Sequence, residues 1–189
     1  AYTDSDPNWV APPPPPPPAP GQPAARPVSP PSMTVFIRGK INARNEWVES
    51  QEIWRAPYSL YTPSGSHYGT RMIFDRQGFL YFSLGERGNQ NNAQDLKTPL
   101  GMIHRVRDDG SVPADNPFVN TPGAVKSIWT YGHRNPEGLA FDPVTGQLWE
   151  SEHGPTGGDE INIIVKGHNY GWGVASMGVQ PGITKQHAE

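Results

Sequence analysis

The chain of 189 residues contains no cysteine. This absence excludes disulfide bonds, thiolate metal sites and a cysteine nucleophile. An excess of positive charge is also missing, because 15 Lys and Arg residues stand against 18 Asp and Glu residues and the formal net charge is −3. A chain of this charge with no basic cluster is a poor candidate for binding nucleic acid or an anionic membrane surface.

Long apolar runs are absent as well. No stretch approaches the roughly 18 apolar residues that a membrane-spanning helix needs, and we expect no signal peptide in this sequence, because no apolar segment follows a charged start. No stretch has a 3.6-residue apolar period. The motifs HExxH, GxGxxG, GxSxG and the phosphate loop are missing too, which argues against zinc hydrolases, Rossmann enzymes and P-loop enzymes.

Proline is abundant, and 13 of the 23 prolines lie within residues 7–31. Such a tract favours extended polyproline II structure without a packed core of its own. Composition alone would suit a terminal tail or a linker, but the flanking residues 1–4 and 33–38 look like two neighbouring strands. We therefore interpret residues 5–32 as a disordered, Pro-rich insertion within a hairpin. A PxxP-type ligand for an aromatic groove remains an alternative.

From residue 33 onward, short β-branched or aromatic runs alternate with turn residues, which is typical of strands. Residues 71–84 and 138–151 each predict a tight hairpin, and their equivalent aspartates, Asp75 and Asp142, lie 67 residues apart. This spacing exceeds the roughly 40–50 residues of simple propeller repeats, so each unit must carry large loops. Further strands are predicted over residues 46–54, 101–106, 126–131 and 160–165. The predicted fold class is all-β.

A repeated antiparallel unit of this kind cannot bury both of its faces alone. About three units fit in the chain, whereas a closed propeller has four to eight blades. We therefore expect an open arc of about three blades that belongs to a longer gene product.

Several separated motifs carry a specific resemblance. They are GHRNPEGLAF at residues 132–141, EHGPTGGDEIN at 152–162, NYGW at 169–172, SHYGTR at 66–71, GERG at 85–88 and AQDL at 93–96. In these motifs the chain resembles the soluble glucose/sorbosone and aldose sugar dehydrogenases that depend on pyrroloquinoline quinone (PQQ). The resemblance implies one partial dehydrogenase domain over residues 1–189, within a six-bladed β-propeller.

The resemblance assigns the acid–base chemistry to His67. A lone histidine in this position would more often be a solvated loop residue, but in the family motif it takes the proton from the anomeric hydroxyl of the sugar. Imidazole suits that role because it can exchange a proton near neutral pH. Asp159 is expected to orient His67, as a carboxylate does for a catalytic imidazole. The alternative is that Asp159 and Glu160 are a solvated pair at the start of a strand.

The resemblance also implies a PQQ site and a calcium site. Arg134 and Asn135 would contact the cofactor, since a guanidinium and an amide can pair with quinone or carboxylate oxygens. His153 would contact it too, although glucose-type members have glutamine there. Calcium ligands are expected at Gly154, Pro155, Glu160 and Tyr170. The main-chain carbonyls of Gly154 and Pro155 would be suitable oxygen ligands.

Other residues suggest no further metal site. His104, His133, His168 and His187 lack a ligand spacing. Residues 108–116 have the start of an EF-hand-like pattern but no glutamate at its twelfth position, and we interpret them as a blade loop.

The implied function is PQQ-dependent oxidation of an aldose sugar at its anomeric carbon to the lactone, with electrons passed to an external acceptor. A periplasmic or secreted location follows from the family alone. The 189-residue chain by itself is expected to bind PQQ weakly and to be inactive, because further cofactor contacts lie in other blades of the family. The alternatives are a calcium-binding propeller that binds a sugar or partner, and a lactonase-type hydrolase.

Overall fold

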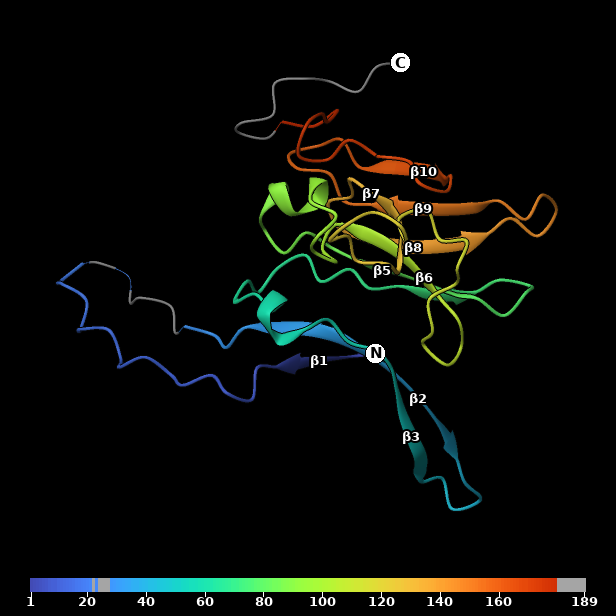
Figure 1. Ribbon diagram of the computed structural model, residues 1–189. Helices are drawn as coiled ribbons and strands as arrows, with labels where there is room; N and C mark the ends of the chain where they lie inside the picture. The colour runs from blue at the N-terminus through green and yellow to red at the C-terminus, as the bar shows by residue number, and fades with distance from the viewer. Residues whose placement is uncertain (22, 24–27, 180–189) are drawn as a thin grey trace.

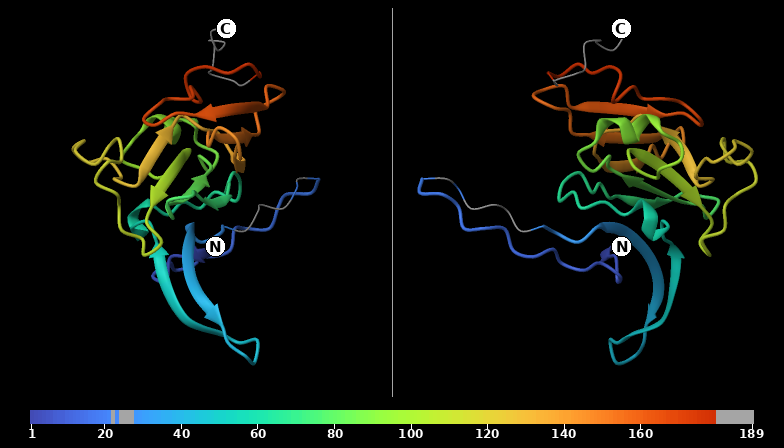
Figure 2. Two further views of the ribbon diagram at one scale, coloured as in Figure 1. Left: turned by 90° about the vertical axis from the view of Figure 1, so that its right-hand side faces the viewer. Right: turned by 60° about the vertical axis from the view of Figure 1, so that its left-hand side comes forward.

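The computed structural model describes residues 1–21, 23 and 28–179. Antiparallel strands form three sheets, with the orders β1-β2-β3, β4-β5-β6-β7 and β10-β9-β8. The sheets follow one another as three layers, and the hairpin of β2 and β3 extends beyond the other two (Figures 1 and 2). Within the described residues, no helix is long and apolar enough to cross a membrane. The predicted all-β class is confirmed.

The first sheet contains β1 (Tyr2–Ser5), β2 (Ser32–Ile41) and β3 (Trp47–Trp54). Strand β1 pairs antiparallel with β2, and Ser5 lies opposite Ser32. The Pro-rich segment therefore connects two paired strands, as the flanking residues predicted, and its described parts extend away from the sheets (Figure 1). Residues 22 and 24–27 of the predicted insertion lie outside the described residues, and its disorder stays a prediction.

The second sheet contains β4 (Met72–Phe74), β5 (Leu80–Leu84), β6 (Met102–Val106) and β7 (Ile128–Tyr131). The third contains β8 (Pro136–Phe141), β9 (Leu148–Glu152) and β10 (Glu160–Ile164). Both predicted hairpins are confirmed by the pairing of β4 with β5 and of β8 with β9. The carboxylate of Asp75 closes the first turn, because its Oδ1 accepts from the amides of Gln77 and Phe79, both at 2.9 Å.

Two short 3₁₀ helices were not predicted. They are η1 (Tyr58–Leu60) and η2 (Gln90–Gln94). Helix η2 begins after Asn89, whose side chain accepts a hydrogen bond from the Asn91 amide at 3.2 Å. This cap satisfies an otherwise unpaired N–H at the start of the helix.

The core has two clusters, one on each side of the second sheet. Leu80, Phe82 and Leu84 pack with residues of the first sheet, such as Met33 and Phe36. Tyr81, between them in sequence, packs toward the third sheet with Leu139, Leu148 and Ile164. Alternate side chains of a strand point to opposite faces, so the complete burial of β5 shows that both faces of the middle sheet are covered.

Candidate functional site

Loops that are distant in sequence meet at one end of the second and third sheets. The loop before β4 carries His67, the loop after β5 carries Glu86, and the loop after β7 carries Arg134 and Asn135. The amide of Glu86 donates to the Arg134 carbonyl at 2.9 Å, and the amide of Gly69 donates to Asn135 Oδ1 at 3.0 Å. The structure therefore brings His67 and Arg134 together, as the predicted site requires.

A cavity of about 290 Å³ lies between these loops. Its lining residues are His67, Glu86, Gly88, Asn89, Gln90, Arg134 and Trp172. A much smaller cavity of about 10 Å³ lies beside it. Its lining residues are Arg134, Glu152, His153, Gly154, Gly158, Glu160, Trp172 and Ser176. Arg134 and Trp172 line both cavities. His67 therefore lies across a shared wall from three of the predicted cofactor and metal residues, His153, Gly154 and Glu160.

His67 is held in an unusual conformation. Its φ of 52° lies in the left-handed region, which a residue with a side chain adopts only when its surroundings enforce it. Its Nδ1 is paired with the Glu86 carboxylate, and the Glu86 side chain is only 2% exposed. A carboxylate accepts, so Nδ1 carries the proton and Nε2 is left as the basic nitrogen. In the described part of the chain, Nε2 has no hydrogen-bond partner.

The expected partner of His67 requires a correction. Asp159 was predicted to orient the imidazole, but the structure gives that contact to Glu86. The exposed Asp159 carboxylate instead accepts from the Gly154 amide at 2.9 Å, which closes the loop between β9 and β10. Glu86 lies just after the end of β5, directly beside the His67 loop. The sequence offered a signal, since Glu86 belongs to the GERG motif at 85–88.

Arg134 and Asn135 differ in how many of their side-chain polar atoms are still available to bind a ligand. Arg134 donates from one terminal nitrogen to the His153 carbonyl at 3.1 Å, and its guanidinium carbon lies 5.2 Å from the Trp172 ring centroid. Asn135 is buried, with its oxygen bound to the Gly69 amide and its nitrogen donating to Glu137 at 2.9 Å. Arg134 is therefore the stronger candidate for ligand contact, and Asn135 mainly links the loops.

Four buried polar atoms around the larger cavity have no hydrogen-bond partner among the described residues. They are Glu86 Oε2, Gln90 Oε1, Arg134 Nε and Trp172 Nε1. Buried polar atoms without partners are few in folded proteins and costly to maintain. Two are donors and two are acceptors, so the group suits a polar ligand of mixed character. Gln90 and Trp172 received no role from the sequence, although Trp172 lies in the NYGW motif.

The expected calcium ligands lie around the β9–β10 loop. Gly154 approaches the carbonyl oxygens of Gly157 and Gly158 so closely that a Cβ atom would not fit. Such a turn, crowded with main-chain oxygens, suits a hard cation. The hydroxyl of Tyr170 is already occupied, because it donates to the Ile163 carbonyl at 2.6 Å and accepts from the Val165 amide at 2.8 Å. A cation contact from Tyr170 would therefore use its main-chain carbonyl.

The remaining residues predicted for this region have protein partners. His153 is exposed, and its Nε2 lies 3.3 Å from Glu137 Oε2. Oε2 of Glu160 accepts from the side-chain amide of Asn162 at 3.2 Å. Both residues stand at the edge of the site.

A buried group of His133, Glu150 and Glu152 lies behind the site, with potential ligand atoms within 4.8 Å of one another. Sequence spacing gave no sign of it. Both ring nitrogens of His133 have protein partners, Glu152 at 3.1 Å and Thr130 at 2.9 Å. We therefore interpret the group as a hydrogen-bonded network and not as an open metal site.

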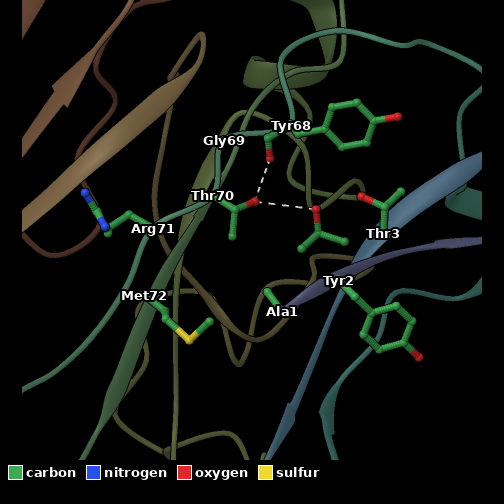
Figure 3. Close-up of a pocket in the computed structure, with 9 residues that line it drawn as sticks. Ala1, Tyr2, Thr3, Tyr68, Gly69, Thr70, Arg71 and Met72 are labelled. Carbon is green, nitrogen blue, oxygen red and sulfur yellow. Dashed lines mark hydrogen bonds between the residues drawn. The ribbon is translucent and has the colours of Figure 1, made fainter.

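A separate pocket of about 430 Å³ lies between β1, β2 and the segment that follows His67 (Figure 3). Its wall includes Thr34 and Thr70, and the Thr70 hydroxyl donates to the Tyr68 carbonyl at 2.8 Å. Neither His67 nor Arg134 lines this pocket. The cavity of about 290 Å³ that contains His67 and Arg134 is therefore the candidate site, although this separate pocket has the greater volume.

Comparisons with known proteins find a matching family and several similar chains. A model of the glucose/sorbosone dehydrogenase family matches residues 25–188. Aldose sugar dehydrogenase YliI of Escherichia coli (strain K12) is 49% identical over 116 residues, which cover 61% of this chain and 31% of that protein.

Two solved structures extend the comparison. A glucose dehydrogenase superposes with a TM-score of 0.79 at 38% identity, over 84% of this chain and 46% of that one. The PQQ-bound form of aldose sugar dehydrogenase from Streptomyces coelicolor gives a TM-score of 0.63 at 30% identity, over 85% of this chain and 46% of that one. The chain thus spans about a third of the curated relative and about half of these structures.

These glucose dehydrogenase structures are β-propellers, so the three sheets form part of a propeller. The total of six blades stays a prediction.

Proposed function

The chain belongs to the glucose/sorbosone dehydrogenase family, and from this we propose that its complete protein is a PQQ-dependent sugar dehydrogenase. It would oxidise an aldose at the anomeric carbon to the lactone and pass the electrons to an external acceptor. One observation carries the proposal. The His67–Glu86 pair and Arg134 line one cavity, where four buried polar atoms lack partners within the described residues.

The cavity has features that fit PQQ, a planar quinone with carboxylate groups. Arg134 and the Trp172 indole offer donors that match quinone and carboxylate oxygens. Arg134, Asn135 and His153 are the residues that would hold the cofactor from this side. When bound, PQQ supplies the oxidising power of the reaction, and the protein supplies binding and orientation.

Calcium would be held by Gly154, Pro155, Glu160 and Tyr170. The carbonyl-crowded turn at Gly154 supports this assignment, because main-chain and carboxylate oxygens are the ligands that calcium prefers. Asp159 has a supporting role in this proposal, since its carboxylate holds the Gly154 amide and thereby shapes the turn.

His67 would act as the general base through Nε2, which takes the proton of the sugar's anomeric hydroxyl. Glu86 keeps the proton on Nδ1 and stabilises the positive charge that forms on the ring. Because Glu86 is buried, this attraction is screened less than it would be in water. The Arg134 guanidinium supplies positive charge on the wall it shares with His67, where a developing negative oxygen would be stabilised.

Replacing His67 with alanine tests the proposal in the protein produced from its complete open reading frame. General-base catalysis contributes roughly 10²–10⁴-fold, so His67→Ala should lower kcat with glucose by that order while PQQ absorbance on the protein is retained. Turnover is measured by dye reduction after PQQ and Ca²⁺ are added. Exposed His168 provides the matched control, because His168→Ala removes an imidazole away from the cavity.

Near-normal turnover of His67→Ala would reject the assignment of the base. Hydrolysis of a lactone by the wild-type protein, without any dye reduction, would favour the lactonase alternative. The periplasmic or secreted location belongs to the same proposal, and fractionation of cells that express the complete gene would test it.

A further inference from the structure

Glu152, at the end of β9, receives hydrogen bonds from three consecutive residues. Its Oε2 accepts from the main-chain amides of Arg134 and Asn135, the latter at 3.3 Å. Its Oε1 accepts from Nδ1 of His133 at 3.1 Å. Hydrogen bonds to an ionised carboxylate are about twice as strong as those between neutral groups. One buried side chain therefore fixes the whole turn that connects β7 to β8.

His133 strengthens this arrangement. Its ring is completely buried and stacks on Tyr170, with centroids 4.7 Å apart, and its Nε2 is bound to the Thr130 hydroxyl at 2.9 Å. The main chain of His133 also donates to the Gly101 carbonyl at 3.0 Å. Because both ring nitrogens of His133 are hydrogen-bonded and its ring is stacked, the imidazole is a rigid support for Glu152.

The opposite side of the same turn touches the catalytic loops. The Arg134 carbonyl accepts from the Glu86 amide, and Asn135 Oδ1 accepts from the Gly69 amide. Residues 133–135 thus stand between the Glu152 carboxylate and the His67–Glu86 pair. Glu152 does not line the cavity of about 290 Å³ that contains His67. It lines only the cavity of about 10 Å³ beside it, where its carboxylate is bound to the turn, so its effect on the chemistry at His67 would act through this turn.

We propose that Glu152 is a positioning residue, whose carboxylate sets the place of the Arg134 guanidinium relative to His67. The inference rests on the proposed function for its catalytic part. The ordering of the turn by Glu152 is a separate claim about the protein without cofactor, and it can be tested independently. Residues that fix a reacting group within a fraction of an ångström are worth large factors in rate.

Hydrogen–deuterium exchange of the Arg134 and Asn135 amides in the cofactor-free protein is the direct test. Glu152→Gln keeps the size of the side chain but has a single, uncharged acceptor oxygen, which cannot serve both the two amides and His133 Nδ1–H as the carboxylate does. The loss of one such bond should speed exchange at the two amides about tenfold, while the β5 and β6 amides remain protected. Glu49→Gln is the matched control, because Glu49 is an exposed carboxylate on the β2–β3 hairpin.

Glu152→Asp retains the charge with a shorter reach, and it should restore part of the protection. In the holoenzyme, Glu152→Gln should lower kcat about tenfold or more with a smaller change in KM, since Arg134 and His67 act on the chemical step. Unchanged exchange at both amides, or faster exchange with unchanged kcat, would overturn the inference. If the wild-type protein shows no dehydrogenase activity, the proposed function fails, while the exchange result still decides the structural claim.

The wild-type protein offers a second measurement should Glu152→Gln fail to fold. Nitrogen-15 NMR should find His133 with its proton on Nδ1, because a carboxylate can only accept. A proton on Nε2 alone would show that Glu152 does not receive this bond, and would overturn the proposal that Glu152 orders the turn of residues 133–135.

Discussion

At the scale of single residues, the acid–base chemistry of Glu150 departs far from that of the free amino acid. It lies in β9 with 1% of its surface exposed, and one carboxyl oxygen has no partner in the described structure. Burial, assisted by the charge of Glu152, raises the pKa of Glu150 to about 9. Glu150 is therefore a neutral carboxylic acid at pH 7 in the folded protein.

This state predicts a specific pH dependence. The unfolded chain releases the Glu150 proton near pH 4.5 and the folded chain near pH 9, so stability falls as pH rises between these values, by up to about 1.4 kcal/mol per pH unit. Glu150→Gln removes the titrating carboxyl group, so the free energy of unfolding of the variant should depend less on pH. Its gain in stability over the wild type should be largest at the highest pH. Denaturant unfolding at pH 6, 7 and 8 measures it. Parallel curves for wild type and variant would contradict the prediction.

Sequence motifs were sufficient to predict that His67 and Arg134 belong to one site, because several motifs in a fixed order leave little freedom in the alignment with the family, and both residues line the same cavity. They were not sufficient to find the partner of His67. Asp159 and Glu86 are both carboxylates inside Gly-containing motifs of this sequence, and only the fold shows which one lies beside the imidazole. The sequence did not indicate a role for Gln90 or Trp172 for a related reason. A buried polar atom without a hydrogen-bond partner can be recognised only when the folded structure shows its neighbours.

At the scale of elements, the hairpins were predictable because their turn residues act locally. The Asp75 carboxylate and Gly78, with φ of 85°, determine the β4–β5 turn without help from the rest of the chain. Helix η2 was not predictable from periodicity, since Gln90–Gln94 contains one buried apolar residue, Ala93. The irregular register between Pro136 and Gly138 was also missed, because it depends on contacts across the sheet.

Gly85 is a loop position at which packing leaves no room for a side chain. A Cβ there would overlap the His67 carbonyl and lie 2.7 Å from Asn135 Oδ1. Gly85→Ala should therefore push two site loops apart, with a loss of about 1–3 kcal/mol in stability and a clear drop in kcat. Thermal unfolding and dye reduction measure both effects.

Gly65 supplies the control for this experiment. It lies in the same loop as His67, a Cβ added there would meet no atom within 4 Å, and its φ is not positive. Gly65→Ala should leave stability and turnover near the wild-type values. Equal behaviour of the two variants would show that the close approach at Gly85 is unimportant.

At the scale of the whole molecule, the site depends on the packing of successive sheets as layers, which brings their loops together. His67 lies in the loop before the second sheet, and Glu86 lies in the loop between β5 and β6 of that sheet. Arg134 lies in the loop that connects the second sheet to the third, and Glu152 lies in the third sheet. Buried clusters on both faces of the second sheet hold these layers in place. The repeat of hairpins indicated such layers from the sequence, whereas the meeting of their loops at one cavity required the folded chain.

The Pro-rich segment is the part of the molecule that this arrangement needs least. Pro12–Pro18 are exposed, and the described main-chain bonds of residues 6–31 stay within that range, such as that from the Asp6 amide to the Pro31 carbonyl at 2.9 Å. The β1–β2 pairing and the ion pair of Asp4 with Arg55 lie outside it. Replacing residues 8–29 with a short Gly-Asn turn should therefore preserve the first sheet.

Shortening a loop lowers the entropy cost of closing it, by only about 0.6 kcal/mol for each halving of its length. The shortened protein should thus be as stable as wild type or slightly more stable, with unchanged PQQ binding and unchanged dye reduction. Thermal unfolding and cofactor titration of the complete protein provide the measurements. A loss of stability of more than about 2 kcal/mol, far beyond the loop-closure effect, would mean that the segment packs on the sheets. Loss of cofactor binding with stability retained would instead place it within the functional site.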